Sequence, residues 1–113
     1  MNKIKKVSNC SARQSVQSRE EFDGANTFAR MVAVSDVEAY YAVYSYGQHF
    51  PLFAYSYILG EWFGNGDKYS QTTSKHRSQL HPSMPMHEVG TRFIKTMLTD
   101  GLVTATATAN GVR

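Results

Sequence analysis

The chain has little of what usually stabilises or arms a small protein: one cysteine, three prolines and one tryptophan in 113 residues. A lone Cys10 cannot form a disulfide within the chain, which fits a reducing cytoplasm. The four histidines and this cysteine match no common zinc spacing, so we expect no metal site. No Gly-x-x-x-x-Gly-Lys-Ser/Thr phosphate loop is present, and we expect no cofactor. These absences exclude disulfide scaffolds, zinc fingers and P-loop proteins.

Strong charge and long apolar segments are also lacking. The net charge is only +3, with 42% hydrophobic residues, which predicts a globular chain and permits nucleic-acid binding without requiring it. Residues 39–60 carry no charge, but Gly47, His49, Pro51 and several tyrosines argue against a membrane span. The basic N-terminus is followed by no apolar run of signal-peptide length. We therefore expect a cytoplasmic protein with no membrane partner.

The apolar pattern predicts an α+β fold, with a small antiparallel sheet of three or four strands and flanking helices. We expect residues 1–9 to be a flexible basic arm, 10–101 a single domain, and 102–113 a tail or edge strand. An edge strand, either this tail or Thr27–Val34, makes a homo-oligomer possible. The expected helices are 10–21, 74–80 and His87–Thr99, and the expected strands are Thr27–Val34, Ala39–Tyr46, Phe50–Leu59 and Trp62–Phe63.

Aromatic side chains are concentrated between Tyr40 and Phe63. Alternation along two hairpin strands predicts that at least half of them form the core of the sheet. The others offer a solvent-facing row for a protein or nucleic-acid partner. The residues expected in this partner surface are Tyr44, Tyr46, Tyr55 and Tyr57.

Residues 67–79, hereafter the polar segment, hold five serines and threonines, three cations and a histidine, and no aliphatic residue. Thr72 or Thr73 can cap a helix, whose free N–H groups attract phosphate. Alternatively, the threonines only cap the helix while the cations face water. The residues expected to bind phosphate or nucleic acid are Lys68, Thr72, Thr73, Ser74, Lys75, His76, Arg77 and Gln79, with His76 and Gln79 reading or orienting the ligand.

An enzyme is the less favoured class. His76 lies near several hydroxyls in sequence, but no nucleophile elbow, orienting carboxylate or paired metal-binding carboxylates accompany it. We predict no catalytic residue, and a phosphoryl-processing enzyme centred on His76 remains the weakest hypothesis.

Three motifs resemble a family of small uncharacterised bacteriophage-encoded proteins: Tyr44-Ser-Tyr-Gly-Gln-His-Phe-Pro51, Trp62-Phe-Gly-Asn65 and Asp67-Lys-Tyr-Ser-Gln-Thr-Thr-Ser-Lys-His-Arg-Ser-Gln79. An upstream Val16-Gln17…Phe22…Asn26 pattern is also similar, so the resemblance covers about residues 10–85. It implies a phage or mobile-element origin and a host-cell cytoplasm. It implies no activity, cofactor or catalytic residue.

Two non-enzymatic functions follow as hypotheses. The first is an accessory protein that contacts nucleic acid, or another phosphate-bearing partner, through the polar segment. The second is a protein-binding inhibitor of a host or defence complex, of the anti-CRISPR or anti-restriction type. A mimic of DNA should be strongly acidic, and this chain is basic.

Overall fold

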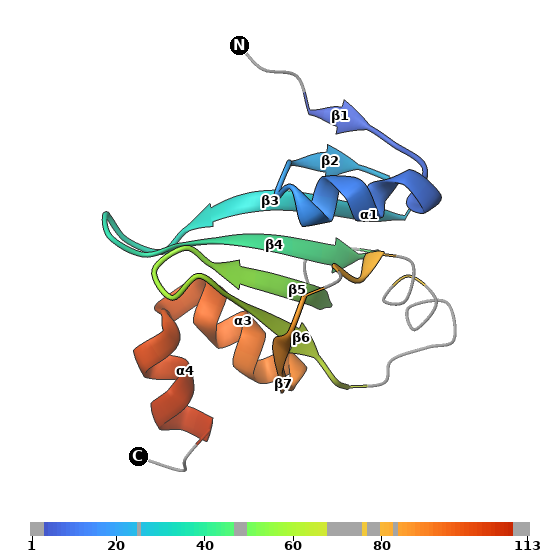
Figure 1. Cartoon of the computed structure of the whole chain (residues 1–113). Coiled ribbons are helices and arrows are strands. Elements are labelled where there is room, and N and C mark those ends of the chain that lie inside the picture. Colours follow the sequence, from blue (N-terminus) through green and yellow to red (C-terminus); the bar gives the residue numbers. More distant parts are fainter. Residues whose placement is uncertain are drawn as a thin grey trace.

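In the computed structural model of the chain, the structure describes residues 4–24, 26–46, 50–67, 76, 80–82 and 84–109. These residues form an α+β fold, as the sequence predicts, but with a sheet of seven strands rather than three or four. The strands are β1 (Lys5–Lys6), β2 (Phe22–Asp23), β3 (Thr27–Ala33), β4 (Ala39–Ser45), β5 (Pro51–Ser56), β6 (Glu61–Asn65) and β7 (Met86–Val89), and the helices are α1 (Asn9–Gln17), α3 (Thr91–Asp100) and α4 (Leu102–Ala109) (Figure 1).

The strands lie side by side in chain order. Strands β2 to β6 form an antiparallel meander, whereas β1 and β7 pair parallel to β2 and β6 at the two edges. A parallel neighbour needs a crossover, so α1 connects β1 to β2, and residues 66–85, which include the polar segment, connect β6 to β7. The added strands are those of two to four residues, too short to show an alternating pattern in the sequence.

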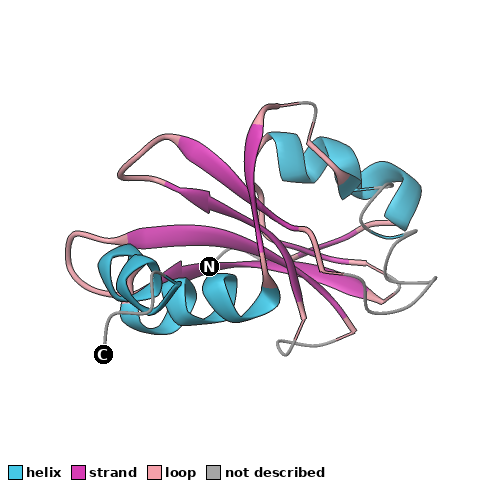
Figure 2. Cartoon of the chain, turned by 90° about the horizontal axis from the view of Figure 1, so that it is seen from below, coloured by secondary structure: helices cyan, strands magenta, loops and turns pink. Residues whose placement is uncertain are grey.

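Both faces of the sheet are covered. On one face, Ala12 and Val16 of α1 and Leu80 pack against Tyr41 and Trp62. On the other, a second core is formed by side chains of α3, α4 and the sheet: Tyr40, Ala54, Phe63, Ile94, Met97 and Ala105. Figure 2 shows the helices on the two sides of the sheet, with α4, near the C label, on the side opposite α1. Two covered faces explain why β4 and β5 are apolar nearly throughout.

The C-terminal segment is a correction to the sequence prediction. Residues 102–109 form helix α4 instead of a tail or edge strand. The alternation of Thr and Ala has the period of a strand, but Ala is the strongest helix former, and Ala105 is buried beside α3. A remote group completes the helix start, because the Leu102 N–H donates to Glu38 Oε2 at 2.8 Å. Gly101, at φ 99°, separates α4 from α3.

Three further features differ from the prediction. The expected helix over His87–Thr99 begins only at Thr91, because Met86–Val89 pairs with β6 as β7. Part of the expected basic arm is ordered in the sheet, since Lys5 and Lys6 form β1. β3 is paired on both sides, so it is not the edge strand that the sequence analysis allowed.

The remaining differences concern the ends of β5 and β6. Pro51 is the first residue of β5, a position that suits proline. It pairs with Tyr44, next to a register shift between Val43 and Tyr44. The expected strand Trp62–Phe63 is longer in the structure, because Glu61, Gly64 and Asn65 also belong to β6. The residues between the expected strands Ala39–Tyr46 and Phe50–Leu59, 47–49, lie outside the described residues. No helix in the described part of the chain is both long and apolar enough to cross a membrane.

Candidate functional site

The polar segment is represented among the described residues by Asp67 and His76. His76 is helical and only 4% exposed, and its Nδ1 lies 2.9 Å from Ser45 Oγ in the interior. A reading or orienting role would require exposure, so the burial of His76 argues against that role and favours one as an anchor of the crossover. The same burial argues against direct attack on a substrate by a Ser45–His76 pair. The other predicted phosphate-binding residues lie outside the described residues: Lys68, Thr72, Thr73, Ser74, Lys75, Arg77 and Gln79.

Asp67 anchors the start of the polar segment. Its Oδ2 accepts a hydrogen bond from the Thr91 N–H at 2.8 Å, at the first turn of α3. Gly90 at the N-cap of α3 provides no side-chain cap, so Asp67 supplies the acceptor from a distance of 24 residues in sequence. A carboxylate is favourable at a helix N-terminus. The connection between β6 and β7 is therefore fixed to α3 at Asp67 and to β4 at His76.

The four tyrosines predicted as a row do not form one. Tyr44 is 5% exposed and stacks on Phe28 with ring centroids 4.9 Å apart. Tyr46 and Tyr57 are exposed, but they follow the C-terminal ends of antiparallel strands β4 and β5 and so lie at opposite ends of the sheet. Tyr55 is half-buried and lies with Tyr57. The prediction treated strand alternation as the only determinant and neglected strand direction.

Exposed apolar side chains gather at the end of the sheet that carries the β3–β4 and β5–β6 turns, at the left of Figure 1. The two turns lie together, because the Tyr57 N–H donates to Ala39 O at 3.3 Å. Tyr57 also reaches β3, where its hydroxyl donates to Met31 Sδ at 3.5 Å. We call this set the apolar rim: Met31, Val37, Tyr57, Ile58 and Leu59.

Arg19 supports the rim from the end of α1. Its guanidinium carbon lies 4.4 Å from the centroid of the Tyr55 ring, in a cation–π contact. Tyr55 in turn meets Tyr57 edge-on at 5.1 Å. Burial raises the pKa of the Tyr57 hydroxyl, and Arg19 partly offsets this rise through its charge and a hydrogen bond. The tyrosine stays neutral at physiological pH and offers both a ring and a hydroxyl at the surface.

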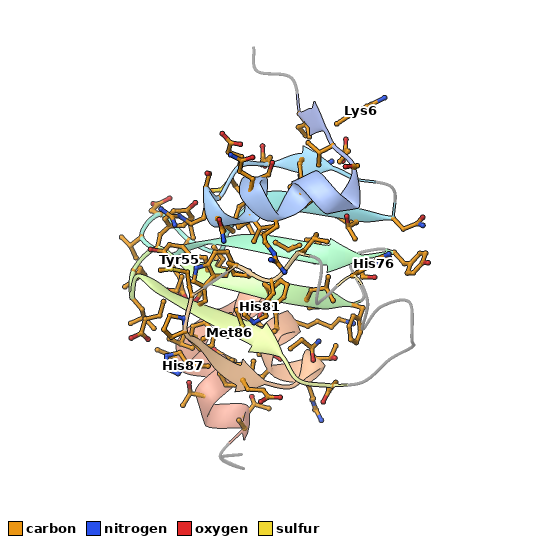
Figure 3. The ribbon with its side chains drawn as sticks, turned by 45° about the vertical axis from the view of Figure 1, so that its right-hand side comes forward. Lys6, Tyr55, His76, His81, Met86 and His87 are labelled. Atoms are coloured by element: carbon orange, nitrogen blue, oxygen red, sulfur yellow. The ribbon has the colours of Figure 1, made fainter. Side chains whose placement is uncertain are left out.

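Directly beyond the rim, a pocket of about 320 Å³ lies between the first residues of β6 and β7. We call it the Trp62 pocket; it is lined by Gly60, Glu61, Trp62, Met84, Pro85, Met86 and His87. Gly60 follows Leu59 and so joins the pocket to the rim. Figure 3 shows Tyr55, Met86 and His87 toward this end of the sheet, with His76 toward the other.

The indole of Trp62 is the most unusual group in the pocket wall. Trp62 is 2% exposed and packs between Tyr41 and Tyr55, at centroid distances of 6.2 and 5.2 Å. Within the described part of the chain, its Nε1 is a buried polar atom that has no hydrogen-bond partner. Buried tryptophan N–H groups usually find an acceptor, and leaving a donor unpaired costs about 1–3 kcal/mol.

Two polar side chains of the pocket lining contact each other. His87 Nε2 lies 2.7 Å from Glu61 Oε1 at the exposed edge, and the His87 ring lies 5.1 Å from that of Phe63. This pair satisfies both polar side chains of the lining without using the Trp62 N–H. No group of three or more His, Cys, Asp or Glu side chains that could hold a metal ion occurs in the part of the chain that the structure describes.

Most of this site was missed by reasoning from the sequence. Only Tyr55 and Tyr57 were expected at a partner surface. Ile58 and Leu59 were placed inside a strand, whereas β5 ends at Ser56 and a turn exposes them. One signal was available: the Met-Pro-Met sequence at 84–86, because methionine is frequent on adaptable binding surfaces.

Comparison of the chain with protein-family models found no matching family, and comparisons with curated proteins and with solved structures found no match. The functional assignment therefore rests on the geometry of the apolar rim and the Trp62 pocket.

Proposed function

We propose that this chain is a small non-enzymatic binding protein that captures an apolar segment of a partner protein on the apolar rim and the adjoining Trp62 pocket. The phage-type resemblance of residues 10–85 makes bacterial host and defence complexes the first partners to test, with the chain acting as an inhibitor.

The observation that carries this proposal is the concentration of exposed apolar side chains at one end of the sheet. Of the nine exposed large hydrophobic residues in the described chain, five form the rim and a sixth, Met84, lines the adjoining pocket. Contiguous apolar surface beside polar groups is typical of a protein-binding site, whereas scattered single residues are not. Tyrosine and methionine are also enriched at the centres of such interfaces.

The experiment captures partner proteins from nuclease-treated lysate of the cells that naturally make the chain. It compares the wild-type chain with matched surface variants. Ile58→Ser with Leu59→Ser removes apolar surface from the rim. Val103→Ser is the control, because Val103 is 85% exposed on α4, outside the rim. We expect the same protein to be captured by wild type and by the Val103 variant, and to be lost with the double variant. Equal capture by all three chains would refute the proposal.

Nucleic-acid binding through the polar segment is the second candidate. The observation that favours it is the fixing of this connection at Asp67 and His76, since fixed ends reduce the entropy lost when Lys68 and Lys75 engage phosphate. Anisotropy of labelled single-stranded DNA and RNA at two salt concentrations tests it. Binding that weakens with salt and with Lys75→Ala plus Arg77→Ala would support it, and salt-independent or absent binding would exclude it.

A further inference from the structure

We propose that the Trp62 pocket binds one aliphatic side chain of an extended peptide segment, and that Trp62 Nε1–H donates a hydrogen bond to a backbone carbonyl beside that side chain. This inference rests on the proposed protein-binding function and names the chemistry that the partner must present.

The unpaired donor selects the ligand's polar group. Trp62 Nε1 is buried and has no partner, so an incoming acceptor would satisfy a group that now lacks a hydrogen bond. The indole N–H is neutral and can only donate. The Glu61 carboxylate in the same lining disfavours an anionic acceptor by like-charge repulsion. A neutral carbonyl oxygen, such as that of a peptide bond, fits better than a phosphate or a carboxylate.

The lining selects the ligand's apolar group. Besides Trp62, the pocket presents Met84, Pro85 and Met86, and its 320 Å³ lies at the small end of the usual range of roughly 300–1,000 Å³ for ligand sites. A single side chain suits this volume better than a large cofactor. Met84 is 52% exposed, and its flexible thioether can adapt to the shape of a bound side chain.

The pocket lies where a longer peptide can also contact the apolar rim and β7. Gly60 lies next to Leu59 of the apolar rim, so a segment that places a side chain in the pocket can continue over the rim. On the other side lies β7, the last strand in the order of the sheet. An extended backbone can approach such an edge, and alternate side chains then reach pockets. A second copy of β7 is a poorer occupant, because the strand is short and Glu88 places a charged group on it.

The chain offers its own reporter, because Trp62 is the only tryptophan. The wild-type chain labelled with ¹⁵N, and with ¹³C at the methionine methyls, is titrated with N-acetyl-leucine-N′-methylamide. The matched probe is N-acetyl-glycine-N′-methylamide, which has the same carbonyls and no side chain. We expect saturable shifts of the Trp62 indole N–H, downfield, and of the Met84 and Met86 methyls with the leucine compound, and much weaker shifts with the glycine compound.

A variant separates the hydrogen bond from the pocket. Trp62→Phe retains an aromatic ring but lacks the donor, and we expect the leucine compound to bind about two- to tenfold more weakly, followed by the methionine methyls. If this variant fails to fold, the wild-type indole shift alone decides. Methyl shifts without an indole shift would overturn the donor role, and no saturable shift with the leucine compound would overturn the site.

These results are distinguishable from failure of the proposed function. Partner capture that depends on Ile58 and Leu59, combined with no response to the leucine compound, would refute only the pocket inference. Capture that ignores the rim variants would refute the proposed function whatever the titration shows.

Discussion

Ser45 Oγ and His76 Nδ1 lie 2.9 Å apart in the interior of the protein, joining the last residue of β4 to the crossover between β6 and β7. The two residues are 31 positions apart in sequence. The Tyr46 ring also lies beside His76, with the two ring centroids 5.4 Å apart. The contact with Ser45 ties His76 to β4, although the sequence predicted that the same side chain reads or orients a ligand.

The first prediction concerns this contact. Ser45→Ala and His76→Ala each remove one partner of a buried hydrogen bond, so we expect each to lower the free energy of unfolding by about 1–3 kcal/mol. Urea denaturation of both single variants and the double variant measures the coupling between them. A coupling of at least about 0.5 kcal/mol is expected, and strictly additive losses would contradict the anchoring role.

Glu38 ties the β3–β4 turn to α4. Its Oε2 accepts hydrogen bonds from the Leu102 N–H and from the Tyr40 hydroxyl. Glu38→Ala leaves both donors without this acceptor, and we expect a loss of about 1–3 kcal/mol together with faster amide exchange in α4. Glu88→Ala, on edge strand β7, provides an acidic control. Unchanged exchange in α4 after Glu38→Ala would show that the helix does not depend on this cap.

Arg19 occupies a position that usually belongs to glycine. At φ 54° it ends α1, and the Glu20 N–H donates to Ser15 O at 2.9 Å as in a Schellman motif. Arg19→Ala keeps the unfavourable φ and loses the contact with Tyr55, so we expect a loss of about 0.5–1 kcal/mol. Arg19→Gly loses the contact but relieves the backbone, and should be the milder change in thermal unfolding. The reverse order would contradict the strain assigned to the positive φ at this position.

Alkaline pH should unfold the protein through its buried tyrosines. Burial raises the pKa of Tyr41 well above the usual value of about 10, and burial and Glu38 do the same for Tyr40. The unfolded chain releases these protons near pH 10 while the folded chain retains them. Stability is therefore fully present below pH 10 and falls above it, by up to about 1.4 kcal/mol per pH unit for each retained proton. Denaturant melts from pH 8 to 11, with ionisation followed at 295 nm, measure this slope.

Tyr41→Phe provides the control for the alkaline prediction. It removes one titrating group, and it also removes the hydrogen bond from the Tyr41 hydroxyl to Glu20 O at 2.6 Å. We expect lower stability at pH 8 and a shallower fall above pH 10. A slope identical to that of wild type would show that Tyr41 does not contribute to alkaline unfolding.

The sequence predicted the central part of the fold because β3, β4 and β5 are six or seven residues long and rich in aromatic and aliphatic side chains. It also predicted a helix over the residues of α3, in which Ile94 and Met97 are buried and Phe93 and Leu98 pack beside them. It could not identify β1 and β7, whose existence depends on pairing with remote strands. The helix over 102–109 depends in the same way on Glu38, which is distant in sequence.

The candidate site was harder to predict, because it is made by turns rather than by a motif. Met31, Val37 and Leu59 come from different elements and meet only because the meander brings the β3–β4 and β5–β6 turns to the same end. The polar segment had the more distinctive composition, yet its one described histidine is buried. Composition therefore indicated a segment, whereas strand direction determined which side chains share a surface.

Site-specific photo-crosslinking tests the central claim most directly. A benzophenone amino acid is placed at Leu59 in one chain and at Val103 in another, and both chains are irradiated in nuclease-treated lysate of the cells that naturally make the protein. We predict one discrete protein adduct at Leu59, lost when Tyr57→Ser is added, and no matching adduct at Val103. Equal adducts at both positions, or none at Leu59, would contradict the assignment of the apolar rim as a protein-binding site.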